Sequence, residues 1–447
     1  MQQKLNNRTS VKHKNRNDND KNIFMNPSRR TFLKGGALAL VTAGLGGVPS
    51  FIAKAAQSRK FWSPYKRHKI MVCIFQRGAM DGLMAVTPFT DTYLQKARPS
   101  LFMSAARSAN KPLIDLDGRF GLHPAMTSFE PLFKEKRLAI IHGVGSPNTT
   151  RSHFDAQDYM ESGTPFNKGT ASGWLNRATG LLGHETATPF QAVSVTSSLP
   201  RSLYGDNAAV AISNLEDFSI QMRGNNIGAV TAAKSFEDLY DKTSSSLLSK
   251  TGKESFEAMK ILKSNGVKGY RPANGAVYPV SPLGNSLKQV AQLIKMDVGM
   301  EIAFAECGGW DTHYNQGTEV GTFARNVGDL SSAITAFWTD IGQYQDDVEV
   351  MTMTEFGRTV HQNGSNGTDH GRGSCMFVLG NNINGGKVHG KVPELSIENL
   401  EDRRDLPVTT DFRAVFDEVA SSHLKIQGDG KLFPDWKGTG IGLMKTS

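Results

Sequence analysis

Short continuous apolar runs recur along the chain, and between them lie stretches with an apolar residue at every third or fourth position. A short apolar run is typical of a strand buried on both faces of a parallel sheet, and the longer spacing is typical of an amphipathic helix. We interpret as strands the runs at residues 69–75, 138–144, 191–196, 208–212, 300–305, 348–353 and 376–379. We interpret as helices the stretches at residues 124–134, 153–161, 283–295, 318–344 and 412–424. This alternation predicts an α/β fold: a doubly wound, mainly parallel sheet with helices on both faces.

Residues 214–282 are more polar and less periodic than the rest, with a helical pattern only in patches. We interpret them as an inserted cap region within one domain that covers residues 57–447. A chain of 447 residues is long enough to bury the large core that such a domain needs.

The first 56 residues have a character of their own. A polar stretch is followed by SRRTFLK at residues 28–34 and by a weakly hydrophobic run, rich in Gly and Ala, at residues 35–53. Ala53 and Ala55 place small residues where a signal peptidase reads them. We expect residues 1–56 to be a disordered N-terminus with a twin-arginine signal peptide, which makes the export machinery a partner and the mature protein periplasmic or secreted.

The alternative for this leader is an uncleaved anchor that keeps the protein at the envelope. The run at residues 35–53 barely reaches the length needed to span a bilayer, and it contains five glycines and a proline. We therefore expect no stable membrane insertion after cleavage.

The net charge of +9 comes almost entirely from the leader. Residues 1–56 hold ten of the 51 basic residues and two of the 42 acidic ones, so the rest carries 41 basic and 40 acidic residues. A nucleic-acid partner needs clustered basic charge on the folded domain, and none stands out. The three cysteines, Cys73, Cys307 and Cys375, adjoin apolar runs, and we interpret them as small buried hydrophobic residues.

Carboxylates and imidazoles stand at the ends of several predicted strands. The segments are CGGWDTH at residues 307–313, TEFGRT at residues 354–359 and GTDHG at residues 367–371, and one more carboxylate follows the first strand. Mixed oxygen and nitrogen ligands suit a divalent metal, Zn²⁺ or Mn²⁺ before Ca²⁺ or Mg²⁺. The candidate metal ligands are Asp81, Asp311, His313, Glu355, Asp369 and His370.

A turn rich in hydroxyl groups precedes the predicted helix at residues 153–161. Thr149, Thr150 or Ser152 is a candidate nucleophile, since a metal lowers the pKa of a hydroxyl and a helix N-terminus stabilises negative charge. The alternative is that these side chains only cap the helix. Arg151 and Arg358 are candidates for clamping a phosphate or sulfate oxygen, and the alternative for each is a structural ion pair.

The motifs together resemble a known family. The twin-arginine leader is followed by RGAMDGL, RSHFDAQDYMESG, GGWDTH, TEFGRT and GTDHGRG in the order found in the DUF1501 family of exported bacterial proteins, and the resemblance covers residues 68–426. That family is in turn similar to the alkaline phosphatase and sulfatase superfamily. Those enzymes use two metal ions and a Ser, Thr or formylglycine nucleophile on a doubly wound α/β sheet.

The resemblance implies roles for several residues. Asp81 would be the metal ligand after the first strand, Asp311 and His313 the later Asp/His pair, and His370 the last metal histidine. The turn at residues 148–153 would carry the nucleophile. Phe356 stands after Glu355 where the superfamily has a metal histidine, so the resemblance leaves one metal, two metals or a degenerate site open.

These observations favour an exported, metal-dependent hydrolase of a small anionic phosphate or sulfate ester. The alternative is a secreted binding or assembly protein without catalytic activity, on a degenerate fold of the same kind. Acids and histidines at strand ends favour the enzyme, whereas Phe356 and the lack of a single obvious nucleophile favour the alternative.

Overall fold

The computed structural model describes residues 39–40, 68–183, 189–215, 269–426 and 430–445. Most of the predicted leader and most of the predicted insertion at residues 214–282 lie outside the described residues. The organisation of the chain into a leader, one domain and an insertion therefore stays a prediction.

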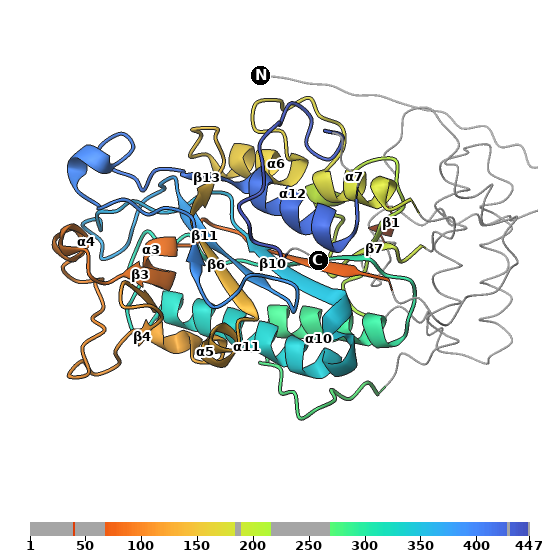
Figure 1. Ribbon diagram of the computed structural model, residues 1–447, viewed down its shortest axis with the longest axis horizontal. Helices are drawn as coiled ribbons and strands as arrows, with labels where there is room; N and C mark the ends of the chain where they lie inside the picture. The colour runs from red at the N-terminus through yellow and green to blue at the C-terminus, as the bar shows by residue number, and fades with distance from the viewer. Residues whose placement is uncertain (1–38, 41–67, 184–188, 216–268, 427–429, 446–447) are drawn as a thin grey trace, which may run out of the picture. The chain divides into compact units, whose positions relative to one another are not determined.

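A ten-stranded sheet forms the centre of the described structure (Figure 1). Its order is β1 (Ala39–Leu40), β8 (Val210–Ala211), β7 (Ala192–Ser194), β9 (Ile302–Cys307), β2 (Ile70–Gln76), β10 (Val348–Met353), β11 (Ser374–Leu379), β6 (Leu138–Gly145) and β12 (Val388–His389). β13 (Thr410–Asp411) also pairs with β6. All pairs are parallel except those of β11 with β10 and β6 and that of β1 with β8.

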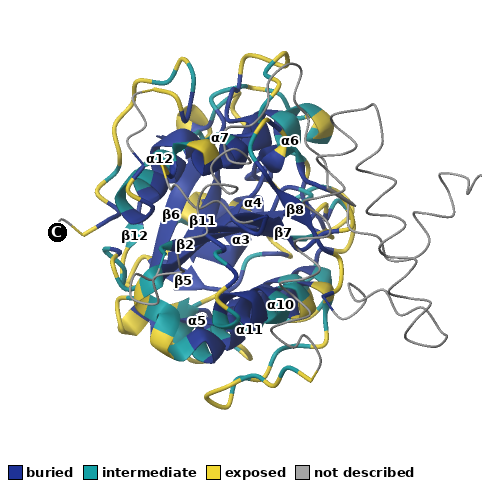
Figure 2. Cartoon of the chain, turned by 90° about the vertical axis from the view of Figure 1, so that its right-hand side faces the viewer, coloured by how far each residue is buried: buried dark blue, intermediate teal, exposed yellow. Residues whose placement is uncertain are grey.

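Helices cover both faces of this sheet (Figures 1 and 2). One face carries α5 (Phe129–Lys134), α10 (Pro282–Lys295) and α11 (Thr322–Ile341), and the other carries α6 (His153–Ser162), α7 (Trp174–Leu181) and α12 (Phe412–His423). Along β2, Val72 and Ile74 join the core under the first set of helices, whereas Cys73 and Phe75 join the core under the second. Because both faces are covered, the whole of β2 is buried, and this explains why the strands are continuous apolar runs in the sequence.

Smaller elements connect these layers. A three-stranded sheet is made by β3 (Val86–Pro88), β5 (Phe120–Leu122) and β4 (Ile114–Asp115), next to the short helices α3 (Gly82–Ala85) and α4 (Thr92–Ala97). Within the described residues, 3₁₀ turns lie at Pro124–Met126, Arg201–Leu203, Gly342–Asp347 and Ile397–Asn399.

The predicted fold class is confirmed, with differences in detail. The helix expected over residues 318–344 is α11, and it is shorter because Gly321 and Gly342 flank it with φ values of +114° and +45°. The stretch at residues 124–134 is divided into a 3₁₀ turn and α5. The antiparallel direction of β11 was not expected from the sequence. It follows from the absence of a helix in residues 354–373, since a parallel connection needs a crossover, usually a helix.

Two further expectations concern the described residues. All three cysteines are free, and Cys73 and Cys375 are fully buried, as expected for small hydrophobic residues. None of the helices in the described part of the chain is long and apolar enough to cross a membrane.

Candidate metal centre

Strand direction brings the predicted polar segments to one edge of the sheet. β2, β6, β9 and β10 are parallel, so their carboxyl ends meet at that edge, and β11 begins there because it runs the other way. The segments at this edge are therefore residues 77–81, 146–153, 308–313, 354–359 and 367–373. Open α/β sheets place their ligands at this edge.

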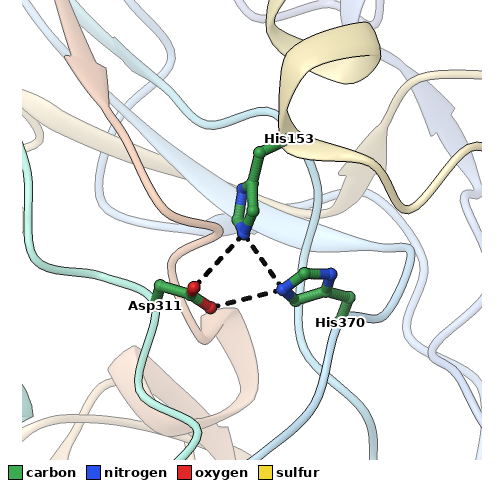
Figure 3. Close-up of side chains that lie close together, drawn as sticks. All are labelled: His153, Asp311 and His370. Carbon is green, nitrogen blue, oxygen red and sulfur yellow. Dashed lines mark hydrogen bonds and ion pairs between the residues drawn. The ribbon is translucent and has the colours of Figure 1, made fainter. Parts of the chain in front are cut away.

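Three side chains turn toward one another here (Figure 3). Nε2 of His153 lies 3.0 Å from Nε2 of His370. Oδ2 of Asp311 lies 3.5 Å from Nε2 of His153, and Oδ1 lies 3.3 Å from Nε2 of His370. One ligand atom from each residue lies within 4.8 Å of the other two, a spacing at which one metal ion can contact all three.

His313 adds a fourth donor beside this group. Its Nε2 lies 2.9 Å from Nε2 of His370 and 3.0 Å from Oδ1 of Asp311. The side chain of His313 is 42% exposed, whereas those of His153 and His370 are 24% and 25% exposed. His313 is therefore the most exposed of the three histidines.

The other ring nitrogen of each histidine contacts an acceptor. Nδ1 of His153 lies 2.8 Å from Oε1 of Glu355, and Nδ1 of His313 lies 2.8 Å from Oδ1 of Asp369. Nδ1 of His370 lies 2.8 Å from the backbone carbonyl oxygen of Arg151. Histidines that bind metals almost always donate their second nitrogen to a carboxylate or a carbonyl in this way.

A chain of hydrogen bonds fixes the tautomer of His153. Arg77 can only donate, so its bond of 3.0 Å to Gln157 identifies the carbonyl oxygen of that amide. The amide nitrogen of Gln157 must then donate to Oε1 of Glu355, at 2.8 Å, and the backbone N–H of Gly78 donates to the same oxygen. Oε1 therefore acts as an acceptor toward His153 as well. In the neutral ring, Nδ1 of His153 therefore carries the proton and Nε2 carries the lone pair.

The same reasoning applies to the other two rings. A carbonyl oxygen can only accept, so Nδ1 of His370 donates to Arg151. Asp369 accepts a hydrogen bond of 3.0 Å from the amide of Asn363, and as a carboxylate it accepts from Nδ1 of His313 too. In the neutral form of each ring, Nε2 therefore carries the lone pair.

Lone pairs that face one another at 2.9–3.0 Å repel unless a cation lies between them. Ligands held 2.0–2.1 Å from a tetrahedral zinc ion lie about 3.3 Å apart, close to the spacings in this group. A single shared proton could satisfy one pair of nitrogens, whereas a metal ion satisfies all the donor atoms together. The residues present therefore fit a divalent metal.

Burial and hydrogen bonding shift the pKa values of the acids in this centre in opposite directions. Burial raises the pKa of Glu355, but hydrogen bonds from His153, Gln157 and Gly78 outweigh it and hold the pKa below its usual value. The hydrogen bond to Glu355 in turn raises the pKa of His153. Burial is the main cause that lowers the pKa of His370.

Asp311 is held from behind by Arg358. Nη1 of this arginine donates to Oδ1 of Asp311 at 2.9 Å, and its Nε donates to Thr368 at 3.3 Å. The guanidinium is buried, and its Nη2 has no hydrogen-bond partner among the described residues. Burial raises the pKa of Asp311, but Arg358 and the neighbouring histidines lower it below its usual value.

Of the six candidate ligands, Asp311, His313 and His370 bring donor atoms together, and Glu355 and Asp369 contact ring nitrogens on the outer side. Asp81 does not reach the group. Its two oxygens accept from Arg98 at 2.8 and 3.1 Å, from Gln316 at 2.7 Å and from the N–H of Met84 at 3.2 Å.

The turn that carries the candidate nucleophiles leads directly into the site. Ser152 is the N-cap residue of α6, but its hydroxyl makes no capping hydrogen bond and the residue is exposed. Oγ1 of Thr150 instead accepts from the N–H of Ser152 at 3.2 Å, and Thr149 is exposed. Arg151 makes ion pairs with Asp402 and Asp405 at 2.7 and 2.6 Å, which is the structural alternative for this residue.

Phe356 packs directly on the centre. It is buried, and its ring centroid lies 4.9 Å from that of His153 and 5.1 Å from that of His370. An apolar ring offers no ligand atom, so this position supports the packing of the two histidines. The arrangement suits one ion better than two.

Sequence reasoning missed His153 and Gln157. His153 has a signal that could have found it, since it begins the helix directly after a predicted strand and turn, as the other polar segments do. Gln157 lies one helical turn further on, and only its contacts in the folded chain identify it. His123 and His142, by contrast, are buried, and burial lowers the pKa of each to about 4.

A family model described as "Protein of unknown function (DUF1501)" matches residues 68–435. The chain belongs to the DUF1501 family. No curated protein matches the sequence.

Solved structures with a similar arrangement include a sulfatase, PsFucS1 from Pseudoalteromonas sp., at 10% identity and a TM-score of 0.38, covering 90% of this chain and 78% of that one. The C-terminal periplasmic domain of EptC from Escherichia coli, in complex with Zn, has 8% identity and a TM-score of 0.32, and the match covers 71% of this chain and 74% of that one. An alkaline phosphatase from the Antarctic bacterium TAB5 has 10% identity and a TM-score of 0.26, and the match covers 70% of this chain and 92% of that one. Similarities this distant leave the function of the DUF1501 chain to be argued from its own site.

Proposed function

We propose that this DUF1501 protein is an exported hydrolase of phosphate or sulfate esters that depends on one divalent metal ion. The observation that carries the proposal is the direction of the three histidines. Each donates from Nδ1 to a fixed acceptor, which leaves Nε2 as the metal-binding atom of the neutral ring. The Nε2 atoms of His153 and His370 and a carboxylate oxygen of Asp311 lie within 4.8 Å of one another, and Nε2 of His313 lies beside that of His370. Side chains that are held by outer partners in this way are already oriented before the ion binds.

His153, Asp311 and His370 would hold the ion, and His313, the most exposed of the three histidines, would be a further donor beside it. Three protein ligands with a further position for water or substrate are typical of catalytic zinc, which can also expand to five ligands. A set of imidazoles with one carboxylate suits Zn²⁺ or Mn²⁺ better than Ca²⁺ or Mg²⁺.

When bound, the metal would polarise an ester oxygen and lower the pKa of a nearby hydroxyl or water. Ser152 is the hydroxyl best placed to attack, because it precedes His153 directly and makes no capping bond. The N-terminus of α6 would stabilise negative charge that develops beside it. Arg358 would hold Asp311 in position and contribute positive charge to the binding of an anion.

The second candidate function is binding or assembly without turnover. Phe356 favours it, since its buried ring packs on His153 and His370 and offers no ligand atom for a second ion. A single ion can hold an anion without cleaving it. The export of the protein is part of both proposals and depends on the leader at residues 1–56.

Elemental analysis of the exported protein, purified without added metal, is the first test. We expect about one Zn or Mn per chain, lost in His370→Ala and Asp311→Asn and kept in His361→Ala, whose imidazole is outside the group. Hydrolysis of 4-nitrophenyl phosphate and 4-nitrophenyl sulfate is then measured on the same samples. Metal with no turnover of either ester would favour the binding protein, and absence of metal from a folded wild type would contradict the metal-dependent hydrolase and also favour the binding protein.

The position of the mature N-terminus tests export separately. Mass spectrometry of protein recovered from the periplasm or medium should show a chain that begins near residue 56. A full-length chain that stays with the membrane fraction would contradict cleavage of the leader.

A further inference from the structure

A chain of buried hydrogen bonds connects the two carboxylates that follow β2 and β9. Nε2 of Gln316 donates to Oδ2 of Asp81 at 2.7 Å, and Oε1 of Gln316 accepts from the hydroxyl of Thr368 at 2.7 Å. Oγ1 of Thr368 accepts in turn from Nε of Arg358 at 3.3 Å, and Nη1 of Arg358 donates to Oδ1 of Asp311 at 2.9 Å. Gln316 and Thr368 are fully buried, so bulk water does not compete for these bonds.

The groups at each end fix the direction of every bond in this chain. Asp81 is paired with Arg98 and can only accept, so the nitrogen of the Gln316 amide faces it. The oxygen of that amide then faces Thr368, which must use its hydroxyl proton there. Arg358 can only donate, so its Nε meets the remaining lone pairs of Thr368. The hydroxyl of Thr368 is therefore fixed as an acceptor for Arg358.

Thr368 holds the buried end of Arg358. Among the described residues, the guanidinium donates to Thr368 and to Asp311, and its Nη2 has no partner. Arg358 is buried, whereas the side chain of Asp311 is 45% exposed. A guanidinium is planar and rigid, so a bond that fixes its Nε also fixes the direction of its Nη1. The contact with Thr368 therefore determines how Arg358 meets the more exposed carboxylate.

The backbone places Thr368 beside the segment that carries Asp311. The N–H of Thr368 donates to the carbonyl oxygen of Thr312 at 3.2 Å. The preceding residue, Gly367, allows this approach, because a Cβ there would lie 2.3 Å from the carbonyl oxygen of His313. Thr368 is therefore fixed to the segment that carries two donors of the metal group, Asp311 and His313.

We propose that Thr368 is a positioning residue of the metal centre. Its hydroxyl, oriented by Gln316, holds the guanidinium of Arg358 so that the carboxylate of Asp311 stays turned toward the histidines. This inference rests on the proposed function, because Asp311 is taken to bind the ion. Thr368 acts through Arg358 and does not itself contact the ion. A ligand that is held in place before binding loses less conformational freedom when the ion binds, so the affinity is higher.

Metal titration of three variants tests the role of the hydroxyl. Thr368→Val removes the hydroxyl and keeps the branched shape, and the affinity for Zn²⁺ should fall roughly 3–10-fold, less than the usual loss for a direct partner of a ligand. Thr368→Ser keeps the hydroxyl and should restore the wild-type affinity. Thr312→Val is the matched control, since the buried hydroxyl of Thr312 donates to the same oxygen of Gln316, at 2.8 Å, and not to Arg358. An unchanged affinity in Thr368→Val, or an equal loss in Thr312→Val, would overturn the proposal.

A double variant shows whether Thr368 acts through Arg358. Arg358→Met has no group that can bond to Thr368 or to Asp311. In this background Thr368→Val should cause no further loss of Zn²⁺ affinity, because the contact it would break is already absent. Urea unfolding alone does not separate the two threonines, since each substitution removes one buried hydrogen bond. A loss of the same size with and without Arg358 would overturn the proposal.

Crystal structures of the metal-free proteins separate this inference from the proposed function. In Thr368→Val the guanidinium of Arg358 should turn away from Asp311, and in Thr368→Ser it should keep its wild-type orientation. If the guanidinium responds in this way but the wild type binds no metal, the positioning of Asp311 is retained and the metal-dependent hydrolase is rejected. If the wild type binds metal but Thr368→Val changes neither the guanidinium nor the affinity, the metal centre is retained and the positioning role is rejected.

Discussion

Two aspartates at the same edge of the sheet are each paired with an arginine, and the two pairs differ in almost every other respect. Asp81 follows β2 and pairs with Arg98, and their side chains are 1% and 2% exposed. Asp311 follows β9 and pairs with Arg358, and here the arginine is buried while the aspartate is 45% exposed. The first pair is closed to solvent and the second is open on the side of the carboxylate.

The difference lies in how fully each carboxylate is satisfied. Asp81 accepts two bonds from Arg98 and one each from Gln316 and the N–H of Met84, so both oxygens are used within the protein. Oδ1 of Asp311 accepts from Arg358, and the carboxylate otherwise faces the three imidazoles. A buried acid that is fully hydrogen-bonded stabilises one conformation, whereas a partly satisfied acid among lone pairs is ready to bind a cation.

The largest expected effect is on the open pair. Asp311→Asn should weaken metal binding by more than 100-fold, because the substitution removes a charged ligand rather than an outer partner. The metal-free protein should lose less unfolding free energy than the Asp81→Ala variant does, because Asn keeps an oxygen that can accept from the buried Arg358 and the side chain at position 311 is partly exposed to solvent. Metal titration measures the loss of affinity, and urea unfolding of the same sample measures the change in stability. Equal loss of stability and metal binding would show that Asp311 is structural.

The closed pair should behave in the opposite way. Asp81→Ala leaves Arg98 buried without its charge partner, and such changes cost about 3–5 kcal/mol of unfolding free energy. Metal should still bind wherever the variant remains folded, so titration is done at low temperature. Gln316→Leu, which removes one neutral contact to Asp81, is the milder companion if the alanine variant does not fold. If folded Asp81 variants lose the metal, Asp81 is a metal ligand after all.

Sequence reasoning could place both aspartates at the sheet edge but could not tell them apart. Both follow buried strands, which made the fold and the position of the site predictable from apolar runs and polar strand ends. What separates them is contact with Arg98, 17 residues along the chain from Asp81, and with Arg358, 47 residues from Asp311. No sequence spacing indicates an ion pair between residues this far apart. Glu355 and Asp369 were expected as metal ligands for a similar reason, because the sequence shows that acids lie near histidines but not which ring nitrogen each acid contacts.

Outer partners of the open site should have intermediate effects. Glu355→Gln keeps an acceptor for Nδ1 of His153 but removes the negative charge, so the imidazole becomes a weaker base. We expect a 10–100-fold loss of metal affinity, the usual range for such partners. Glu306→Gln is the control, since Glu306 contacts Arg77 but not a histidine. An unchanged affinity in Glu355→Gln would show that His153 is not a ligand.

Gln157→Leu should act through Glu355 and cost less, near the lower end of that range. The substitution removes one donor from the carboxylate and one acceptor from Arg77, which keeps its ion pairs with Glu161 and Glu306. The bonds from Gly78 and His153 to Glu355 remain. Because both residues act on the same ring nitrogen, the double variant with Glu355→Gln should lose less than the two single losses added. If the losses of metal-binding free energy in the two single variants add up to that of the double variant, Gln157 does not act on the metal site through Glu355.

The smallest effect concerns a third carboxylate, which sharpens the contrast between closed and open acids. Asp340 is fully buried and accepts from Tyr270 at 2.7 Å, Tyr278 at 2.9 Å, the N–H of Ala273 at 2.6 Å and the ammonium of Lys295. Burial raises its pKa, but these hydrogen bonds outweigh it and hold the pKa below the ordinary value of 3.8.

Because the pKa of Asp340 is lower in the folded state, its contribution to stability is complete above pH 3.8 and is lost as the pH falls through the folded value. Asp340→Asn should therefore show a shallower loss of unfolding free energy than the wild type as the pH falls below about 4. Asp155→Asn, which removes an exposed partner of Lys168, should keep the wild-type slope. Urea unfolding at several pH values measures how the unfolding free energy of each of the three proteins depends on pH. Identical slopes for wild type and Asp340→Asn would show that the buried, fully hydrogen-bonded Asp340 does not stabilise the fold through its charge.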